Sequence, residues 1–84
     1  MNRNDKMDMA RLLYFDMHKE AVDFIKDKPM DLMAMELFIM GFDIERLDLL
    51  SPVKSLILNF DGSLLTMRSR TRLEVLKKGL SNLK

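Results

Sequence analysis

Cysteine is absent from this chain of 84 residues, and glycine and proline are scarce, at three and two residues. A chain without cysteine has no disulfide scaffold, no thiolate metal site and no cysteine nucleophile, and nothing in it requires an oxidising compartment. We therefore expect a cytoplasmic protein. Because glycine and proline are typical of linkers, their scarcity predicts that residues 1–84 form a single domain.

Long hydrophobic runs are also missing. The longest, Leu37–Phe42, has six residues and includes Gly41, whereas a helix needs roughly 20 apolar residues to cross a bilayer. Near the N-terminus, Asp5 and Asp8 interrupt what would be the basic region of a signal peptide, and Leu12–Phe15 is too short for its apolar core. No interaction with a membrane is therefore expected.

The residues that usually carry catalysis or hold metal ions are few. His18 is the only histidine, and its neighbours at i−4 and i+4, Tyr14 and Val22, are neither metal ligands nor catalytic carboxylates. The serines match helix caps and turns rather than a nucleophile elbow. The aspartates lack the spacing of a calcium loop, and the glycines are too scattered for a phosphate-binding loop. We expect no enzymatic activity, no cofactor and no metal site.

Charge is unevenly distributed, although the net charge is only +1. Residues 1–65 carry 8 Lys/Arg against 12 Asp/Glu, and residues 66–84 carry 6 against 1, so the body has a formal charge of −4 and the C-terminal segment +5. A basic segment of this kind can point to a nucleic-acid or other acidic partner. It can equally pair with the protein's own acidic face.

The first part of the chain has the pattern of one long amphipathic helix. Asp5 is expected to cap it, and the helical spacing of apolar residues extends it to about Lys28. A row of carboxylates at i+3 and i+4 spacing forms an acidic strip beside the apolar face: Asp16, Glu20, Asp23 and Asp27. Like charges at this spacing repel by roughly a few tenths of a kcal/mol per pair. The strip is either a solvated face or a docking site for a basic surface.

The most apolar stretch, Met30–Ile44, is predicted to form a short helix that ends at Gly41 in a left-handed cap. Its apolar residues lie on nearly every face, and such a helix is buried either in a core or in a partner. We favour a partner, because a chain this small builds only a small core and methionines suit adaptable surfaces. The predicted partner-binding residues are Leu32, Met33, Met35, Leu37, Ile39 and Met40.

Two more helices are expected in the middle of the chain. Asp43 is the predicted N-cap of a short helix, and Ser51-Pro52 is the predicted start of another that reaches Phe60. An alternative exists at residues 55–68, because Asp61-Gly62 between two apolar runs is also a strong β-hairpin signal that would make the fold α+β. The helical spacing of the apolar residues favours the helix.

The last helix is predicted to begin at a capping box, Thr71–Glu74, and to end near Gly79. The basic side chains of this region could contact the phosphates of a nucleic acid: Arg68, Arg70, Arg72, Lys77 and Lys78. However, the expected recognition helix has no Asn or Gln to read adenine, and the rest of the chain is acidic. Nucleic-acid binding is therefore the alternative function.

Several stretches resemble, in their order, the layout of the small helical biofilm and acid-resistance regulators of enteric bacteria: Tyr14-Phe15, Gly41-Phe-Asp-Ile44, the helix near Val53–Phe60 and Arg70-Thr-Arg-Leu-Glu-Val-Leu76. The resemblance covers about residues 14–78. It implies a connector protein that modulates two-component signalling, and dimerisation has been described in that family. It assigns no role to any single residue.

Together these patterns predict an all-α fold, a small bundle of one long N-terminal helix and three to four short helices, with a basic C-terminal segment at residues 66–84. The predicted function is that of a small non-enzymatic regulator or adaptor. It would bind a protein partner, or a second copy of itself as a homodimer, through the apolar Met-rich helix. The alternative is a nucleic-acid-binding regulator that uses the basic segment.

Overall fold

The computed structural model describes residues 1–82, and in this range the chain forms helices and no strand. The all-α prediction is confirmed, and the alternative hairpin at residues 55–68 is wrong. The elements are α1 (Arg3–Tyr14), α2 (His18–Ile25), α3 (Leu32–Gly41), the 3₁₀-helix η1 (Ile44–Val53), α4 (Lys54–Asn59), the 3₁₀-helix η2 (Gly62–Leu64) and α5 (Met67–Ser81).

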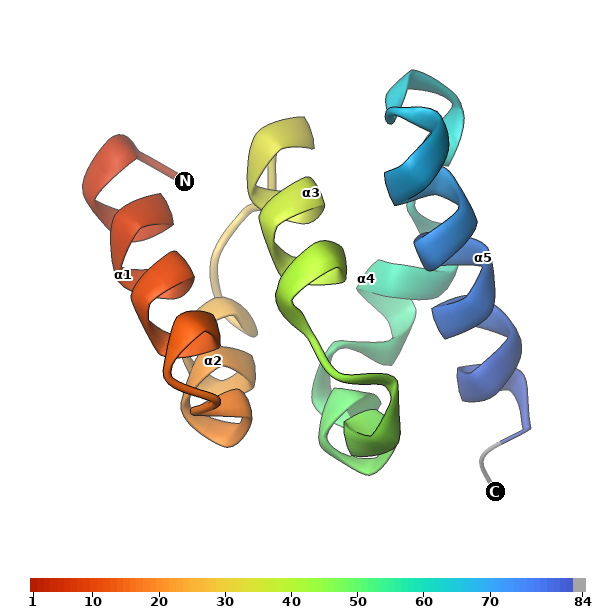
Figure 1. Cartoon of the computed structure of the whole chain (residues 1–84), viewed down its shortest axis with the longest axis horizontal. Helices are drawn as coiled ribbons and strands as arrows, with labels where there is room; N and C mark the ends of the chain where they lie inside the picture. Colours follow the sequence, from red (N-terminus) through yellow and green to blue (C-terminus); the bar gives the residue numbers. More distant parts are fainter. Residues whose placement is uncertain (83–84) are drawn as a thin grey trace.

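The helices form two layers (Figure 1). In the front layer α1, α3 and α5 lie side by side and run in the same direction, with α3 in the centre. Behind them lies a back layer of α2, η1 and α4, in which η1 packs against both of the others. We call the exposed side of α1, α3 and α5 the front of the molecule.

A tight turn at Asp16 separates α1 from α2. Asp16 has a φ of 57°, which lies in the left-handed region. The N–H of Met17 donates to the carbonyl of Leu12 at 2.8 Å, and the N–H of Asp16 donates to the carbonyl of Leu13 at 3.2 Å. This pair of hydrogen bonds is the Schellman motif, which ends a helix and reverses the chain.

The turn corrects the prediction of one long helix from Asp5 to Lys28. The first helix has only 12 residues, and its N-cap is Asn2, whose Oδ1 accepts a hydrogen bond from the N–H of Asp5 at 2.8 Å. Glycine usually occupies the left-handed position of a Schellman motif, and aspartate is one of the few other residues that adopt this conformation. No glycine or proline therefore marks the break in the sequence.

Both ends of α3 are held by contacts with α1. At its start, the carboxylate of Asp31 accepts a hydrogen bond from the N–H of Ala34 at 2.8 Å and lies 2.8 Å from Nζ of Lys6. The bond from Lys6, and then the one from Ala34, lowers the pKa of Asp31 below its ordinary value. At its end, Gly41 leaves space for α1, because a Cβ there would lie 2.9 Å from Cδ1 of Leu13.

The left-handed cap predicted at Gly41 is wrong. This residue is the last of α3, and no glycine among residues 1–82 has a positive φ. The chain leaves the helix through Phe42, which has an extended backbone. The glycine is therefore required by the close approach of α1 and not by the turn.

The segment between α3 and α5 has two of its predicted turn residues in capping roles. The carboxylate of Asp43 accepts a hydrogen bond from the N–H of Glu45 at 3.0 Å and starts η1. Asp61 does the same for the N–H of Ser63 at 3.0 Å, and this bond lowers the pKa of Asp61. Asp61-Gly62 thus opens η2 instead of a hairpin. The helix predicted to start at Ser51-Pro52 begins later, since η1 continues to Val53.

The last helix begins more than one turn before the predicted capping box. Thr66 is its N-cap, and the Thr66 hydroxyl accepts a hydrogen bond from the backbone N–H of Ser69 at 3.3 Å. Thr71 lies inside the helix, where its hydroxyl donates to the carbonyl of Met67 at 2.9 Å. Gly79 also lies inside α5 instead of ending it. The capping-box prediction is wrong because Thr66 supplies an earlier cap.

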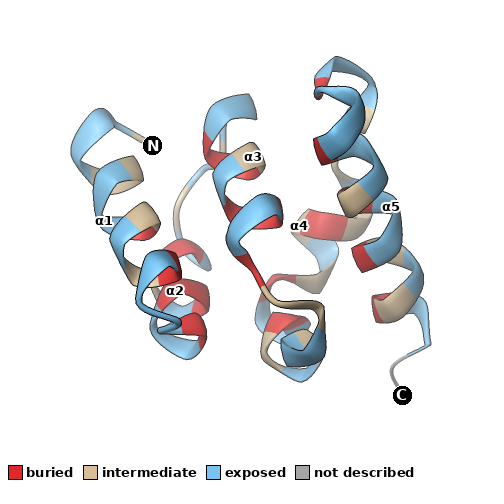
Figure 2. Cartoon of the chain, viewed as in Figure 1, coloured by how far each residue is buried: buried red, intermediate tan, exposed pale blue. Residues whose placement is uncertain are grey.

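The core lies between the two layers (Figure 2). Every α-helix of the described chain contributes to it, and so does η1. The largest fully buried side chains are Phe38, Phe42, Met9, Ile25, Met35, Ile39, Leu50, Ile57, Leu73, Leu76, Leu80 and Val22. Much of the front of the molecule stays exposed, as the pale ribbon in Figure 2 shows.

The turn at Asp16 generates a test of the fold. We expect Asp16→Gly to raise the free energy of unfolding by up to about 1 kcal/mol, because glycine adopts a positive φ without steric cost. The matched control is Glu74→Gly, at an exposed site within α5. That change should lower the free energy of unfolding by about 0.5–1 kcal/mol. Urea unfolding measures both, and a loss of stability in Asp16→Gly would contradict the left-handed turn.

Candidate functional site

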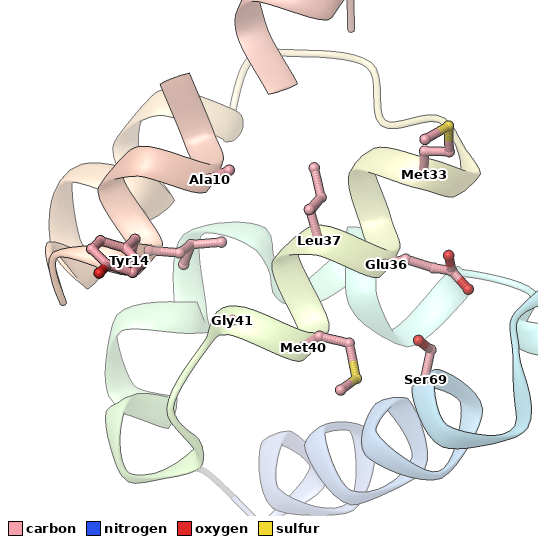
Figure 3. A pocket seen from close by; sticks show the side chains of 9 residues that line it. Ala10, Tyr14, Met33, Glu36, Leu37, Met40, Gly41 and Ser69 are labelled. Carbon is pink, nitrogen blue, oxygen red and sulfur yellow. The ribbon is translucent and has the colours of Figure 1, made fainter. Parts of the chain in front are cut away.

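An open channel lies over the exposed edge of α3, between α1 and α5. Its floor is formed by Met33, Leu37 and Met40, which recur at i, i+4 and i+7 along α3. Ala10 and Tyr14 line the side that belongs to α1 (Figure 3). The hollow has a volume of about 480 Å³. We call it the front channel.

The front channel continues toward α5 as a second hollow of about 660 Å³. Met40 is shared by the two hollows, and Arg68, Thr71, Arg72 and Val75 line the second one. The floor and the α1 side are therefore mainly apolar, whereas the α5 side also carries two arginines.

Two polar side chains lie where the floor approaches the start of α5. Oε1 of Glu36 accepts a hydrogen bond from the backbone N–H of Thr66 at 3.2 Å. A carboxylate is favourable at this place, because the N-terminus of a helix carries a partial positive charge. Ser69 is 4% exposed, and its side chain points toward the same region as Glu36 in Figure 3. The contact of Glu36 holds α5 beside α3 and so helps to form the channel.

The six predicted partner-binding residues divide into two groups. Met35 and Ile39 are fully buried, at 0% exposure, and belong to the core between the layers. Their assignment to a binding surface is corrected, because their positions on α3 face the back layer. The other four residues are on the surface, and three of them form the channel floor: Leu32 at 37% exposure, Met33 at 65%, Leu37 at 37% and Met40 at 38%.

The α1 side of the channel is absent from the sequence-based prediction. Tyr14 fits the apolar stripe of a long helix, but in the structure it lies at the end of α1 and is 82% exposed. Phe15 is also exposed and packs edge-on against Tyr14, with ring centroids 5.1 Å apart. Only knowledge of the turn at Asp16 would have placed these two rings on the surface.

The predicted acidic strip is not one continuous row. Asp16 lies in the turn, Glu20 and Asp23 lie on α2, and Asp27 follows the end of that helix. All four side chains are exposed, and Oδ1 of Asp23 lies 3.9 Å from Nζ of Lys26. The prediction of one helical row is wrong, because the chain turns at Asp16. Glu20 and Asp23 belong to the back layer, away from the front channel.

Arg72, predicted to contact a nucleic acid, is bound to the C-terminal end of α3. Its Nη2 donates to the carbonyl of Phe42 at 2.6 Å, and its Nε donates to the carbonyl of Ile39 at 3.3 Å. A guanidinium at this position satisfies carbonyls that lack partners within the helix and neutralises the partial negative charge there. Arg72 therefore joins α5 to α3.

The other four basic residues of the prediction differ in their contacts. Arg70 donates to the carbonyl of Ser63, and Lys77 donates to the carbonyl of Phe60, both at 2.9 Å. Arg68 and Lys78 are exposed, and neither makes a hydrogen bond or an ion pair through its side chain within residues 1–82. Of the five predicted residues, only Arg68 and Lys78 therefore have side chains available to bind a ligand without losing a contact within residues 1–82. Leu83 and Lys84 of the basic segment lie outside the described residues.

His18 is buried at the start of α2 and does not line the front channel. Its side chain is 4% exposed, and its ring packs edge-on against Phe42, with centroids 5.0 Å apart. Neither ring nitrogen has a hydrogen-bond partner among the described residues. Oδ1 of Asp16 lies 4.0 Å from Nε2, which is too far for a hydrogen bond. The ring contributes packing, and its unpaired nitrogens cost stability.

Comparison of the chain with protein-family models, curated proteins and solved structures finds no match. Within residues 1–82, no cluster of three or more His, Asp or Glu side chains is placed to hold a metal ion. The same part of the chain has no helix that combines the length and apolar composition required to cross a membrane.

The burial of His18 generates a prediction about stability. We expect His18→Leu to leave the free energy of unfolding unchanged or to raise it by up to about 1 kcal/mol, because it removes two unpaired buried nitrogens and keeps an apolar side chain. Lys19→Leu, at the exposed neighbouring position, is the control and should change it by less than about 0.5 kcal/mol. Thermal unfolding by circular dichroism compares them. A marked loss in His18→Leu would show that the imidazole makes a required polar contact.

The contacts of Arg72 generate a second prediction. Arg72→Met should lower the free energy of unfolding by about 1.5–3 kcal/mol, because two carbonyls at the end of α3 lose a charged donor. Arg68→Met removes the same charge from an exposed site one turn away and should change stability by less than about 0.5 kcal/mol. Urea unfolding measures the difference. If the two variants were equally stable, the hydrogen bonds of Arg72 to the end of α3 would not contribute to stability.

Proposed function

We propose that this protein is a small non-enzymatic regulator or adaptor that binds a protein partner through the front channel. The observation that carries the proposal is the row of Met33, Leu37 and Met40 on the exposed edge of α3. The helix α3 lies in the centre of the front layer between α1 and α5 (Figure 1), and all three side chains are partly exposed. Apolar groups gathered in a hollow of this kind are typical of binding grooves.

The composition of the floor supports a protein as the ligand. Methionine side chains are unbranched and polarisable, so they adapt to apolar surfaces of different shapes. Tyr14 adds an aromatic ring at the edge, a residue type that is enriched in protein interfaces. The polar group Glu36 is already bonded to Thr66 and contributes to the shape of the channel. These features favour binding over chemistry.

Two occupants follow from the sequence, a different protein and a second copy of this chain. The resemblance to connector regulators of two-component signalling is compatible with both and remains part of the proposal, as does a cytoplasmic location. Nucleic-acid binding is the weaker candidate, because Arg70, Arg72 and Lys77 are bonded to backbone carbonyls of the same chain.

The proposal predicts that Leu37→Lys strongly weakens partner binding while the protein stays folded. Leu37 is partly exposed, so a lysine there can extend toward solvent, but its charge would be buried against any apolar ligand. Capture of partners from the native host, with chemical cross-links mapped to α3, identifies the complex. We expect the affinity for the captured partner to fall by about tenfold or more in the variant.

The matched control is Leu64→Lys. Leu64 is 77% exposed in η2 and does not line either hollow of the channel, so this variant has the same change of chemistry at a different place. It should bind the partner as the parent chain does. Circular dichroism confirms that both variants remain folded. If Leu37→Lys binds as well as the parent, the channel is not the binding site.

A further inference from the structure

The front channel is a groove over α3 that is bordered by α1 and α5, and a helix of a partner protein could dock along it. Met33, Leu37 and Met40 recur along the exposed side of α3, with Leu37 directed toward Ala10 on α1 and Met40 directed toward Ser69 on α5 (Figure 3). Because Met33 and Met40 are seven residues apart on α3, the floor is about 10 Å long, which matches about two turns of a docked helix. A helix places its own apolar residues at i, i+3, i+4 and i+7, so its apolar face complements a single row of this kind.

The front layer is also cationic. The three front helices α1, α3 and α5 contain eight basic and four acidic side chains, a formal charge of +4. The back elements α2, η1 and α4 contain three basic and four acidic side chains, a formal charge of −1. Arg68 lines the channel on the α5 side and is exposed without a partner among residues 1–82. A ligand in the channel therefore meets apolar side chains below it and the positive charge of Arg68 on the α5 side, while the carboxylate of Glu36 in the lining is bonded to the N–H of Thr66.

Other occupants fit these observations less well. A symmetric pair of this chain, front against front, would bring two cationic layers together, while the acidic residues of α2 would stay on the outside. A nucleic acid has no apolar surface for the methionines and Leu37. A lipid layer is flat, whereas these side chains lie in a hollow between two helices.

We infer that the front channel binds an amphipathic helix of a different protein, whose apolar face lies on Met33, Leu37 and Met40 and whose polar face is acidic toward Arg68. This inference rests on the proposed function and adds the chemistry of the partner. The apolar contacts supply most of the affinity. The opposite charges orient the helix and speed its association, and they do so less as salt concentration rises.

Two synthetic peptides of about 18 residues test the inference. They share one apolar face, with Leu at i, i+3, i+4 and i+7, and differ in the polar face, which carries Glu in one peptide and Lys in the other. Fluorescence anisotropy measures their binding to the full chain over a series of salt concentrations. We expect the Glu peptide to bind about tenfold more tightly at low salt, with a smaller difference at high salt. Its addition should shift the NMR signals of the Met33 and Met40 methyl groups and of Leu37.

Charge reversal at one residue provides the matched variants. Arg68→Glu should weaken binding of the Glu peptide by about fivefold or more, whereas Arg46→Glu, the same change at an exposed site in η1, should alter it less than about twofold. Leu37→Lys should abolish binding of the peptide. Neither charge reversal is expected to unfold the chain, because neither arginine side chain has an ion-pair partner among the described residues.

The possible contrary results distinguish failure of the acidic-helix inference from failure of the proposed protein-binding function. Equal binding of the two peptides, lost in Leu37→Lys, would keep the channel as a protein-binding site and overturn the acidic helix. Absence of NMR shifts with either peptide would overturn the inference, while capture of a natural partner that depends on Leu37 would still support the proposed function. The inference also fails if light scattering finds a dimer that Leu37→Lys dissociates. It fails as well if anionic vesicles or duplex DNA displace the Glu peptide.

Discussion

The reversal of the chain between Tyr14 and His18 decides how the remaining helices pack. One continuous helix from Arg3 to Ile25 would be about 35 Å long, beyond the 32 Å of the molecule's longest dimension. Such a helix would leave half of its apolar stripe without cover. Because the chain turns at Asp16, α1 packs in front against α3 and α2 packs behind against η1. Both halves of the apolar stripe then reach the same core.

Two layers can cover only one side of α3. The back layer and the neighbouring helices bury Met35, Ile39 and the residues adjacent to them, while Leu37 and Met40 remain partly exposed at the front. A helix that is apolar on nearly every face requires cover on nearly every face, and the helices of residues 1–82 leave the front of α3 partly exposed. A bound partner would cover the exposed side of α3 and form a third layer.

Sequence patterns predicted much of the helical structure, because apolar spacing and capping residues act locally. The row Met33, Leu37 and Met40 follows directly from helical periodicity, and the cap at Asp43 follows from its side chain. The turn at Asp16 could not be predicted, since an aspartate in the left-handed region has no distinctive signal in sequence. Whether Met35 and Leu37 are buried or exposed depended on how the other helices pack around α3.

The basic residues of α5 show more clearly that a local sequence pattern does not reveal tertiary contacts. Arg68, Arg70 and Arg72 look equivalent in the sequence, since they alternate along one short stretch. Their roles separate only when α5 docks beside α3 and brings Arg72 to the carbonyls of Ile39 and Phe42, some thirty positions earlier in the chain. A contact of that range depends on tertiary structure, and no local pattern reports it.

The order of packing along the chain has a consequence for folding. The elements α1 and α2 pack against α3 and η1, and these in turn pack against α4 and α5. Two of these packings skip one element of the chain, since α1 contacts α3 and α2 contacts η1. Each such contact must overcome the entropy of closing the loop between its partners, a cost that grows slowly with loop length. The longest return is made by α5, which closes the other side of the front channel by packing against α3. During synthesis from the N-terminus, the channel is therefore complete only after this last helix has been made and has docked.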